Sequence, residues 1–81
     1  MIVIVELSVI SGFLGGPVSR VMVDVGDSVG IDTPLVEIQD ENCVFEFPSQ
    51  FVGRVTELLV NSGERVAWGT PLLVIEISRS T

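Results

Sequence analysis

The sequence has no lysine, histidine or tyrosine, and it has a single cysteine, Cys43. The absence of lysine removes every side-chain amine, and with it every ordinary site for an amide-linked cofactor, for Schiff-base chemistry or for lysine acetylation. One cysteine cannot form an intramolecular disulfide, so no disulfide framework supports the fold. This cysteine usage favours a reducing, cytoplasmic location.

Long apolar runs and basic clusters are also missing. No stretch approaches the roughly 20 apolar residues of a membrane-spanning helix, so we expect no membrane partner. The apolar N-terminus lacks a basic leader and is interrupted by Glu6, so we expect a strand there instead of a signal peptide. Eleven acidic residues against four arginines give a net charge of −7, which disfavours nucleic acid and favours a basic protein surface as partner.

Eighty-one residues are enough for one small domain with one core, and we expect residues 1–81 to form it. Hydrophobic residues make up 47% of the chain, and eight glycines and four prolines are spread among them. This composition excludes disorder and is typical of short strands joined by turns.

The chain contains an internal repeat. Residues 16–39 align with residues 53–76 at a constant offset of 37, with nine identities in 24 positions and no gap. The identical pairs are Gly16/Gly53, Val18/Val55, Val23/Val60, Gly26/Gly63, Val29/Val66, Thr33/Thr70, Pro34/Pro71, Leu35/Leu72 and Ile38/Ile75. Each copy has apolar residues at strand spacing, a glycine turn and a Thr-Pro turn, which predicts short β-strands and no helix.

Two similar half-buried sheets can bury their apolar faces by packing against each other. We therefore predict an all-β fold, a flattened sandwich of two four-stranded antiparallel sheets related by a pseudo-twofold axis. Between the two copies, residues 36–47 read as strand, polar centre and strand. This pattern predicts a β-hairpin whose tip comprises Asp40, Glu41, Asn42 and Cys43.

These motifs resemble the lipoyl domains of 2-oxo acid dehydrogenase acyltransferases and their biotinyl relatives. The resemblance rests on the two Val-x-x-Gly-acid-x-Val segments at residues 23–29 and 60–66, on Glu46-Phe47-Pro48-Ser49, and on Gly53-Arg54-Val55. It covers nearly the whole chain and implies the lipoyl/biotinyl carrier fold, a barrel-sandwich hybrid. The length of residues 10–26 favours the lipoyl branch.

Lipoyl domains carry their modified lysine four residues before the glutamate of the Glu-Val-Pro-Ser motif. Counting back from Glu46 places Asn42 at the lipoyl-lysine-equivalent position, and the family's glutamate three residues earlier is Gln39. An asparagine amide has no basic nitrogen, so lipoate or biotin cannot attach there and we expect no cofactor. Asparagine also suits a tight turn for purely structural reasons.

Lipoyl domains also have a loop beside the lysine hairpin that helps partner enzymes to recognise them. In this chain that loop contains Phe13 and Leu14, which the resemblance identifies as a partner-recognition loop. Trp68 aligns with Ile31 in the repeat. It is either a surface anchor for a partner or, as we expect, a cap on one end of the core.

Cys43 is the one intrinsically reactive group near the tip. No histidine is available to activate it, and Asp40, Glu41 and Glu46 disfavour a thiolate. Lipoyl domains have a small alanine at this position, so the resemblance implies a small buried or half-buried side chain. The three carboxylates are not spaced to converge on a cation, so we expect no metal site. A domain of this size offers no evident cleft for catalysis, so we expect no catalytic residues and no enzyme activity.

The sequence therefore leaves three functions open. The first is a non-lipoylated, lipoyl-domain-like binding module for enzymes that recognise lipoyl domains. The second is a genuine lipoyl carrier domain of a dihydrolipoamide acyltransferase whose lysine has been replaced, and the third is a thiol carrier that uses Cys43. Adaptor-type relatives with a helical insertion between the halves are disfavoured, since the two copies join directly at the hairpin.

Overall fold

The computed structural model describes residues 1–7, 15–40 and 43–77, and all regular structure in these residues is β-strand. The strands are β1 (Ile2–Glu6), β2 (Gly15–Val21), β3 (Ser28–Val29), β4 (Pro34–Gln39), β5 (Val44–Pro48), β6 (Gly53–Leu58), β7 (Arg65–Ala67) and β8 (Pro71–Ile77). The described residues form no helix that is long and apolar enough to span a membrane.

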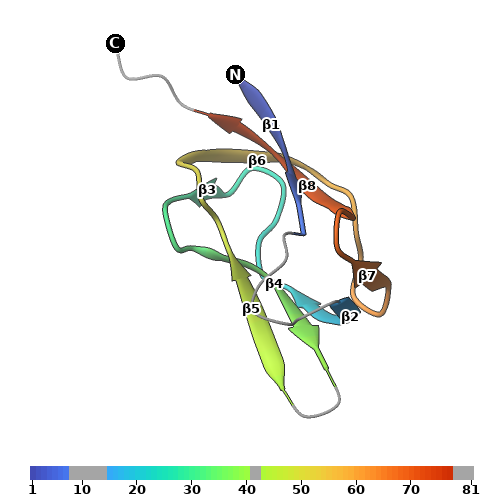
Figure 1. Ribbon diagram of the computed structural model, residues 1–81. Helices are drawn as coiled ribbons and strands as arrows, with labels where there is room; N and C mark the ends of the chain where they lie inside the picture. The colour runs from blue at the N-terminus through green and yellow to red at the C-terminus, as the bar shows by residue number, and fades with distance from the viewer. Residues whose placement is uncertain (8–14, 41–42, 78–81) are drawn as a thin grey trace.

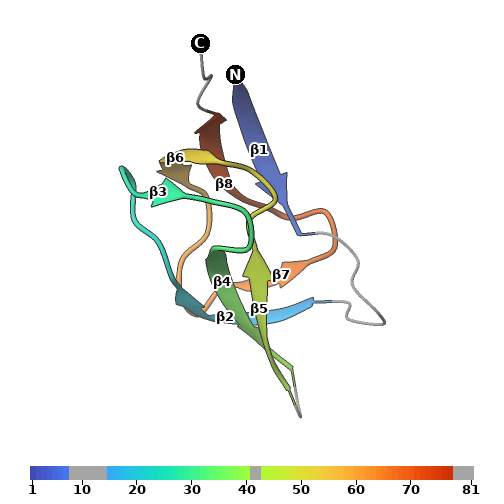
Figure 2. The ribbon, with the colours of Figure 1, turned by 90° about the vertical axis from the view of Figure 1, so that its left-hand side faces the viewer.

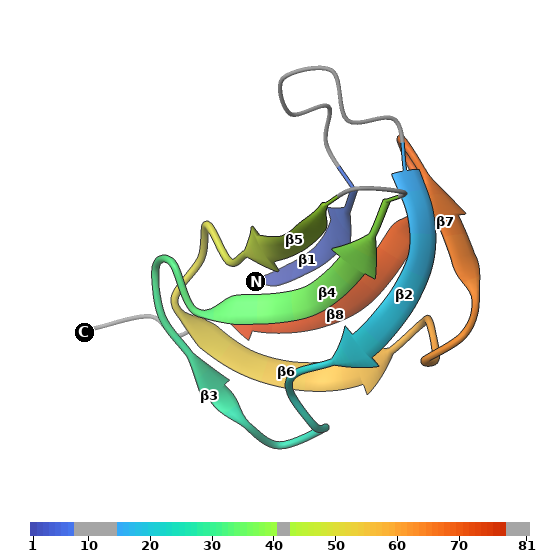
Figure 3. The same ribbon diagram turned by 90° about the horizontal axis from the view of Figure 1, so that it is seen from below.

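The strands form two four-stranded antiparallel sheets, as the sequence predicts. One sheet has the order β1-β8-β6-β3 and the other has the order β5-β4-β2-β7. Figure 3 shows the two layers from below, with β4 and β2 lying over β8 and β6. The hairpin of β4 and β5 projects from the end of the molecule opposite to the start of β1 (Figures 1 and 2).

The two sheets match strand for strand, with β2, β3 and β4 corresponding to β6, β7 and β8 at the offset of 37. The turn glycines Gly26 and Gly63 have φ angles of 99° and 94°, a region that favours glycine. The amide of Gly26 donates to the carbonyl of Val55, and the amide of Gly63 donates to the carbonyl of Val18, both at 2.7 Å. Each half therefore hydrogen-bonds to the other at equivalent positions.

Register irregularities also repeat between the halves. The pairing of β2 with β4 shifts between Val18 and Arg20, and the pairing of β6 with β8 shifts between Val55 and Glu57. Both shifts fall at the same place in the 37-residue repeat. Because a bulge bends its strand and increases its twist, paired bulges curve the two sheets in the same way.

The core lies between the sheets and consists of aliphatic side chains with one phenylalanine. Leu35 and Leu72, an identical pair of the repeat, are both completely buried. The other core residues are Val5, Leu7, Val18, Val23, Val29, Val36, Ile38, Phe47, Val55, Val60, Val66, Leu73 and Ile75. Burial of this apolar surface is the main force that holds the two halves together.

Candidate functional site

The candidate site is the hairpin that connects β4 to β5. Gln39 pairs with Val44, and the amide of Asp40 donates a hydrogen bond of 2.7 Å to the carbonyl of Cys43. Two residues, 41 and 42, connect these partners. Glu41 and Asn42 lie outside the described residues, so the assignment of Asn42 to the lipoyl-lysine position stays a prediction.

The base of the hairpin is fixed by the core. Val36 and Ile38 of β4 are completely buried, and Phe47 of β5 is 4% exposed. A shift of one residue in the pairing would turn these side chains outward, so their burial sets the register of the strands. The same register determines which residues stand at the tip, and it brings Asp40 opposite Cys43.

Ser49 secures the end of β5 that is far from the tip. Its side chain is 1% exposed, and its hydroxyl donates to the carbonyl of Phe51 at 2.8 Å and accepts from the amide of Phe51 at 3.1 Å. Its amide donates to the carbonyl of Thr33, and its carbonyl accepts from the amide of Asp32. Ser49 thus ties the end of the hairpin to the turn before β4.

Polar groups at the described part of the tip face solvent. Asp40, Cys43 and Glu46 are all exposed. The expectation that the Cys43 side chain is buried or half-buried is therefore wrong: Cys43 is exposed and lies outside the core formed by the described residues. Among the described residues, no group of three or more histidine, cysteine, aspartate or glutamate side chains could hold a metal ion.

A hollow of about 410 Å³ lies beside the tip end of the hairpin, lined by residues of β2, β4 and β7 together with Asp40. A side chain on Gly16 would come within 2.6 Å of the carbonyl oxygen of Gln39, so glycine is required for β2 to approach β4 this closely. Arg65 also lines the hollow and brings a positive charge to an otherwise acidic region. Phe13 and Leu14 lie outside the described residues, and their role in partner recognition stays a prediction.

Trp68 is at the surface and is 67% exposed, so the expectation that it caps the core is wrong. Its repeat partner Ile31 is similarly exposed at 60%. Both residues occupy the turn that leads into an inner strand, and Gly69 after Trp68 has a φ of 88°. Ala67 pairs with Gly15 at the start of β2, which places Trp68 close to the hollow beside the hairpin.

Sequence reasoning did not identify Arg65 as part of this region. Arg65 lies on β7, far from the hairpin in sequence, and pairs with Pro17 of β2. The repeat could have indicated that Arg65 lies here. It predicts that the strand after the second glycine turn, which contains Arg65, packs against the first half of the chain. The described surface at this end thus combines the tip end of the hairpin, a glycine-rich strand, an arginine and an exposed tryptophan.

Comparison with known proteins identifies relatives of this chain. A family model described as biotin-requiring enzyme matches residues 4–75. The chain is 39% identical over 59 residues to the dihydrolipoyllysine-residue acetyltransferase component of the pyruvate dehydrogenase complex of Haemophilus influenzae, a match that covers 73% of the chain and 10% of that protein. Identity to the component of the same name in Mycoplasma genitalium is 31% over 70 residues, covering 86% of the chain and 18% of that protein.

Solved structures show the same fold. A single-chain, multi-domain long-chain acyl-CoA carboxylase matches with a TM-score of 0.81 and 22% identity, over 98% of this chain and 7% of that one. The lipoyl domain of the 2-oxoglutarate dehydrogenase complex of Azotobacter vinelandii matches with a TM-score of 0.64 and 21% identity, over 98% of this chain and 100% of that one. The chain thus spans a small part of its curated relatives and the full length of an isolated carrier domain.

Proposed function

Because this chain belongs to the biotin/lipoyl attachment domain family, we propose that it is a lipoyl-domain-like protein that carries no lipoyl or biotinyl group and acts by binding other proteins. Carrier domains of this family normally bear lipoate or biotin. Related domains in the pyruvate dehydrogenase acetyltransferases belong to multienzyme complexes, and such domains interact with the enzymes of those complexes.

One observation carries this proposal: the hairpin is retained in a chain without lysine. The bond from Asp40 to Cys43 closes the hairpin, and the sequence contains no amine side chain to modify. A lipoyl or biotinyl group is held through an amide bond to a lysine, and an asparagine amide is not a nucleophile near neutral pH. The residues present therefore do not fit the family's cofactor, and we assign no acyl- or carboxyl-carrying role to this chain.

We assign the partner role to the surface around the hairpin. The enzymes that act on lipoyl domains must recognise the shape of this hairpin before any chemistry takes place. The exposed carboxylates and the net charge of −7 favour a partner with a basic surface, because opposite charges accelerate association and discriminate between partners. The protein would act in the cytoplasm, in agreement with its free cysteine.

Two alternatives have their own observations. A genuine carrier domain with a replaced lysine agrees with the family assignment, but replacement of one residue does not explain the absence of lysine from all 81 positions. A thiol carrier at Cys43 is favoured by the exposure of that side chain. In the proposed binding module the thiol takes part in no reaction, so the small substitution Cys43→Ala leaves partner binding unchanged, whereas a thiol carrier loses its function.

A competition experiment tests the binding role directly. A lipoate-protein ligase is mixed with a genuine lipoyl domain, lipoate and ATP, and increasing amounts of this chain are added. We expect the chain to slow lipoylation of the genuine domain, since it presents the same hairpin and cannot be consumed. No slowing at a large excess of the chain would overturn the proposal.

Matched variants locate the effect on the hairpin. Glu41→Arg reverses the charge before position 42 and should weaken the competition. Glu57→Arg makes the same charge change at an exposed position of β6, in the other sheet, and should compete like the unmodified chain. Equal loss of competition in both variants would mean that overall charge, and not the hairpin, is responsible.

A further inference from the structure

β1 lies at the open edge of its sheet, and β8 is its one neighbour among the described strands. The amide of Ile77 donates a hydrogen bond of 2.7 Å to the carbonyl of Met1, so these two residues form a hydrogen-bonded pair. Hydrogen-bonded pairs alternate with non-hydrogen-bonded pairs along an antiparallel ladder. The backbone groups of Ile2 and Ile4 therefore point away from β8, and no described strand pairs with them.

β5 is the equivalent edge of the other sheet. Just beyond β1, the amide of Leu7 donates to the carbonyl of Thr70, and just beyond β5, the amide of Ser49 donates to the carbonyl of Thr33. Thr70 and Thr33 are equivalent in the repeat, so β1 aligns with β5 at an offset of 42 residues. At this offset Ile4 corresponds to Glu46, and two positions later β5 has Pro48. Charged side chains and prolines on an edge strand prevent pairing with other chains. β5 thus has both protections, while β1 has an isoleucine where β5 has Glu46.

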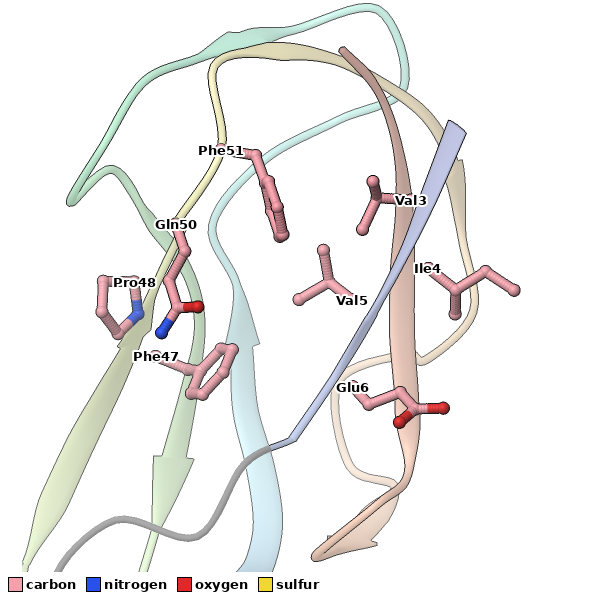
Figure 4. Close-up of a pocket in the computed structure, with 8 residues that line it drawn as sticks. All are labelled: Val3, Ile4, Val5, Glu6, Phe47, Pro48, Gln50 and Phe51. Carbon is pink, nitrogen blue, oxygen red and sulfur yellow. The ribbon is translucent and has the colours of Figure 1, made fainter. Parts of the chain in front are cut away.

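A groove of about 200 Å³, lined mainly by apolar residues, runs between the edges of β1 and β5. Figure 4 shows Val3 and Val5 on one side of it and Phe47 and Phe51 on the other. Val5 and Phe47 are buried and form its floor, whereas Val3 and Phe51 are partly exposed. A strand added to β1 would direct every second side chain toward this groove.

Exposure and charge indicate what kind of strand fits. On the outer face of β1, Ile2 is 65% exposed and Ile4 is 57% exposed, so the other side chains of an added strand would also meet apolar surface. Among the described residues, Glu6 is the one charged residue that lines the groove, and none of the described arginines lines it. A strand with both apolar and basic side chains is therefore complementary to this edge.

We propose that the edge of β1, together with the groove, binds an extended basic segment of another protein as an added β-strand. Main-chain hydrogen bonds to Ile2 and Ile4 supply affinity, and the groove selects apolar side chains at alternate positions. The site is separate from the hairpin tip, which projects from the opposite end of the molecule (Figures 1 and 2). A protein held at β1 therefore leaves the hairpin accessible.

NMR titration of the ¹⁵N-labelled chain with an eight-residue peptide of alternating arginine and valine tests this proposal. We expect chemical shift changes at the amides of Ile2, Ile4 and Phe51, and none at Asp40 or Cys43. A peptide of alternating glutamate and valine should not bind. The arginine peptide with N-methyl groups on alternate amides should also fail to bind, because it cannot complete the ladder.

Variants of the edge provide the second arm. Ile4→Pro removes an outward-facing N–H without affecting the bonds to β8, and should weaken peptide binding by about tenfold or more. Glu46→Pro makes the same change on β5 and should bind the peptide like the unmodified chain. If Ile4→Pro does not fold, Ile4→Lys keeps the strand and places a positive charge against the peptide, with the same expected loss.

Three results would overturn the proposal. The first is the absence of shift changes in β1 at millimolar arginine peptide, and the second is equal binding by the folded Ile4 and Glu46 variants. The third is a combination of two findings: sedimentation shows a dimer of the chain that Ile4→Pro dissociates, and the peptide does not bind. This combination would mean that the edge of β1 binds a second copy of the chain. Because these results report on peptide binding at the edge of β1 and not on ligase recognition at the hairpin tip, the function proposed above is tested separately.

Discussion

The amide of Asp40 donates a hydrogen bond of 2.7 Å to the carbonyl of Cys43, and this bond closes the hairpin at its last described pair. A ligase that modifies this family must find its target amine at the apex of a rigid turn. Here the turn is held in register by buried residues of β4 and β5, while the chain contains no lysine. This protein therefore keeps the closed hairpin but has no side-chain amine to which lipoate or biotin could be attached.

Replacing Ser49 with alanine should destabilise the fold by about 1–3 kcal/mol, because the partly buried amide of Phe51 would lose its acceptor. Ser62→Ala removes a hydroxyl at an exposed position, where its bond to the carbonyl of Ser19 is open to water, and should cost less than about 0.5 kcal/mol. Urea denaturation of both variants measures the difference. Equal free energies of unfolding would show that the Ser49 hydroxyl is not an anchor of the hairpin.

A side chain at Gly53 should also be poorly tolerated. A Cβ there would overlap the carbonyl oxygen of Glu76 and lie 2.8 Å from a methyl group of Ile75. We expect Gly53→Ala to cost about 1–3 kcal/mol of stability through overpacking between β6 and β8. Gly30→Ala is the control, since its nearest neighbour would be the Thr33 hydroxyl at 3.8 Å. A drop in melting temperature as large in the control would contradict the close strand packing described here.

Trp68 should contribute little to stability although it is the largest side chain in the protein. It is 67% exposed, so Trp68→Ala should change the free energy of unfolding by less than about 0.5 kcal/mol. Leu72→Ala removes a completely buried side chain and should cost about 2–5 kcal/mol. A large loss in the tryptophan variant would restore the interpretation that Trp68 caps the core.

Cys43 should react with iodoacetamide in the folded protein, since its side chain is exposed. Intact mass spectrometry would show one adduct formed at the rate of a solvent-accessible thiol, without prior unfolding. The alkylated protein should keep its fold, because the exposed thiol does not contribute to the core. A thiol that reacts only in denaturant would mean that the side chain is covered in solution.

The sequence predicted the architecture because the repeat restricts it strongly. Once Gly26 is aligned with Gly63 and Thr33 with Thr70, each half must contain the same strands and turns, and two such halves can bury their apolar faces only against each other. Paired bulges and cross-half hydrogen bonds follow the same offset.

Exposure at the chain's turns could not be predicted in the same way. The alignment of Trp68 with Ile31 shows that the two positions are equivalent, but it does not show whether another strand covers them, and both are exposed. Cys43 was expected to be covered because the family has a small residue there. Its exposure depends on how far the hairpin extends beyond the core, which is a tertiary property.

The Asn42→Lys variant tests the central claim. Its side chain would supply the missing amine at the predicted position, and if position 42 is the exposed turn that the sequence predicts, the substitution should change stability by no more than about 0.5 kcal/mol. Glu41 would precede the new lysine as an acidic residue does in lipoyl domains, and Glu46 would keep its distance of four residues.

The decisive measurement is the intact mass of the unmodified chain and of Asn42→Lys after incubation with lipoate-protein ligase, lipoate and ATP. We predict no change for the unmodified chain and the addition of one lipoyl group to the variant. A lipoyl adduct on the unmodified chain would contradict this account, and so would a folded Asn42→Lys protein that stays wholly unmodified beside a lipoyl domain that is modified to completion.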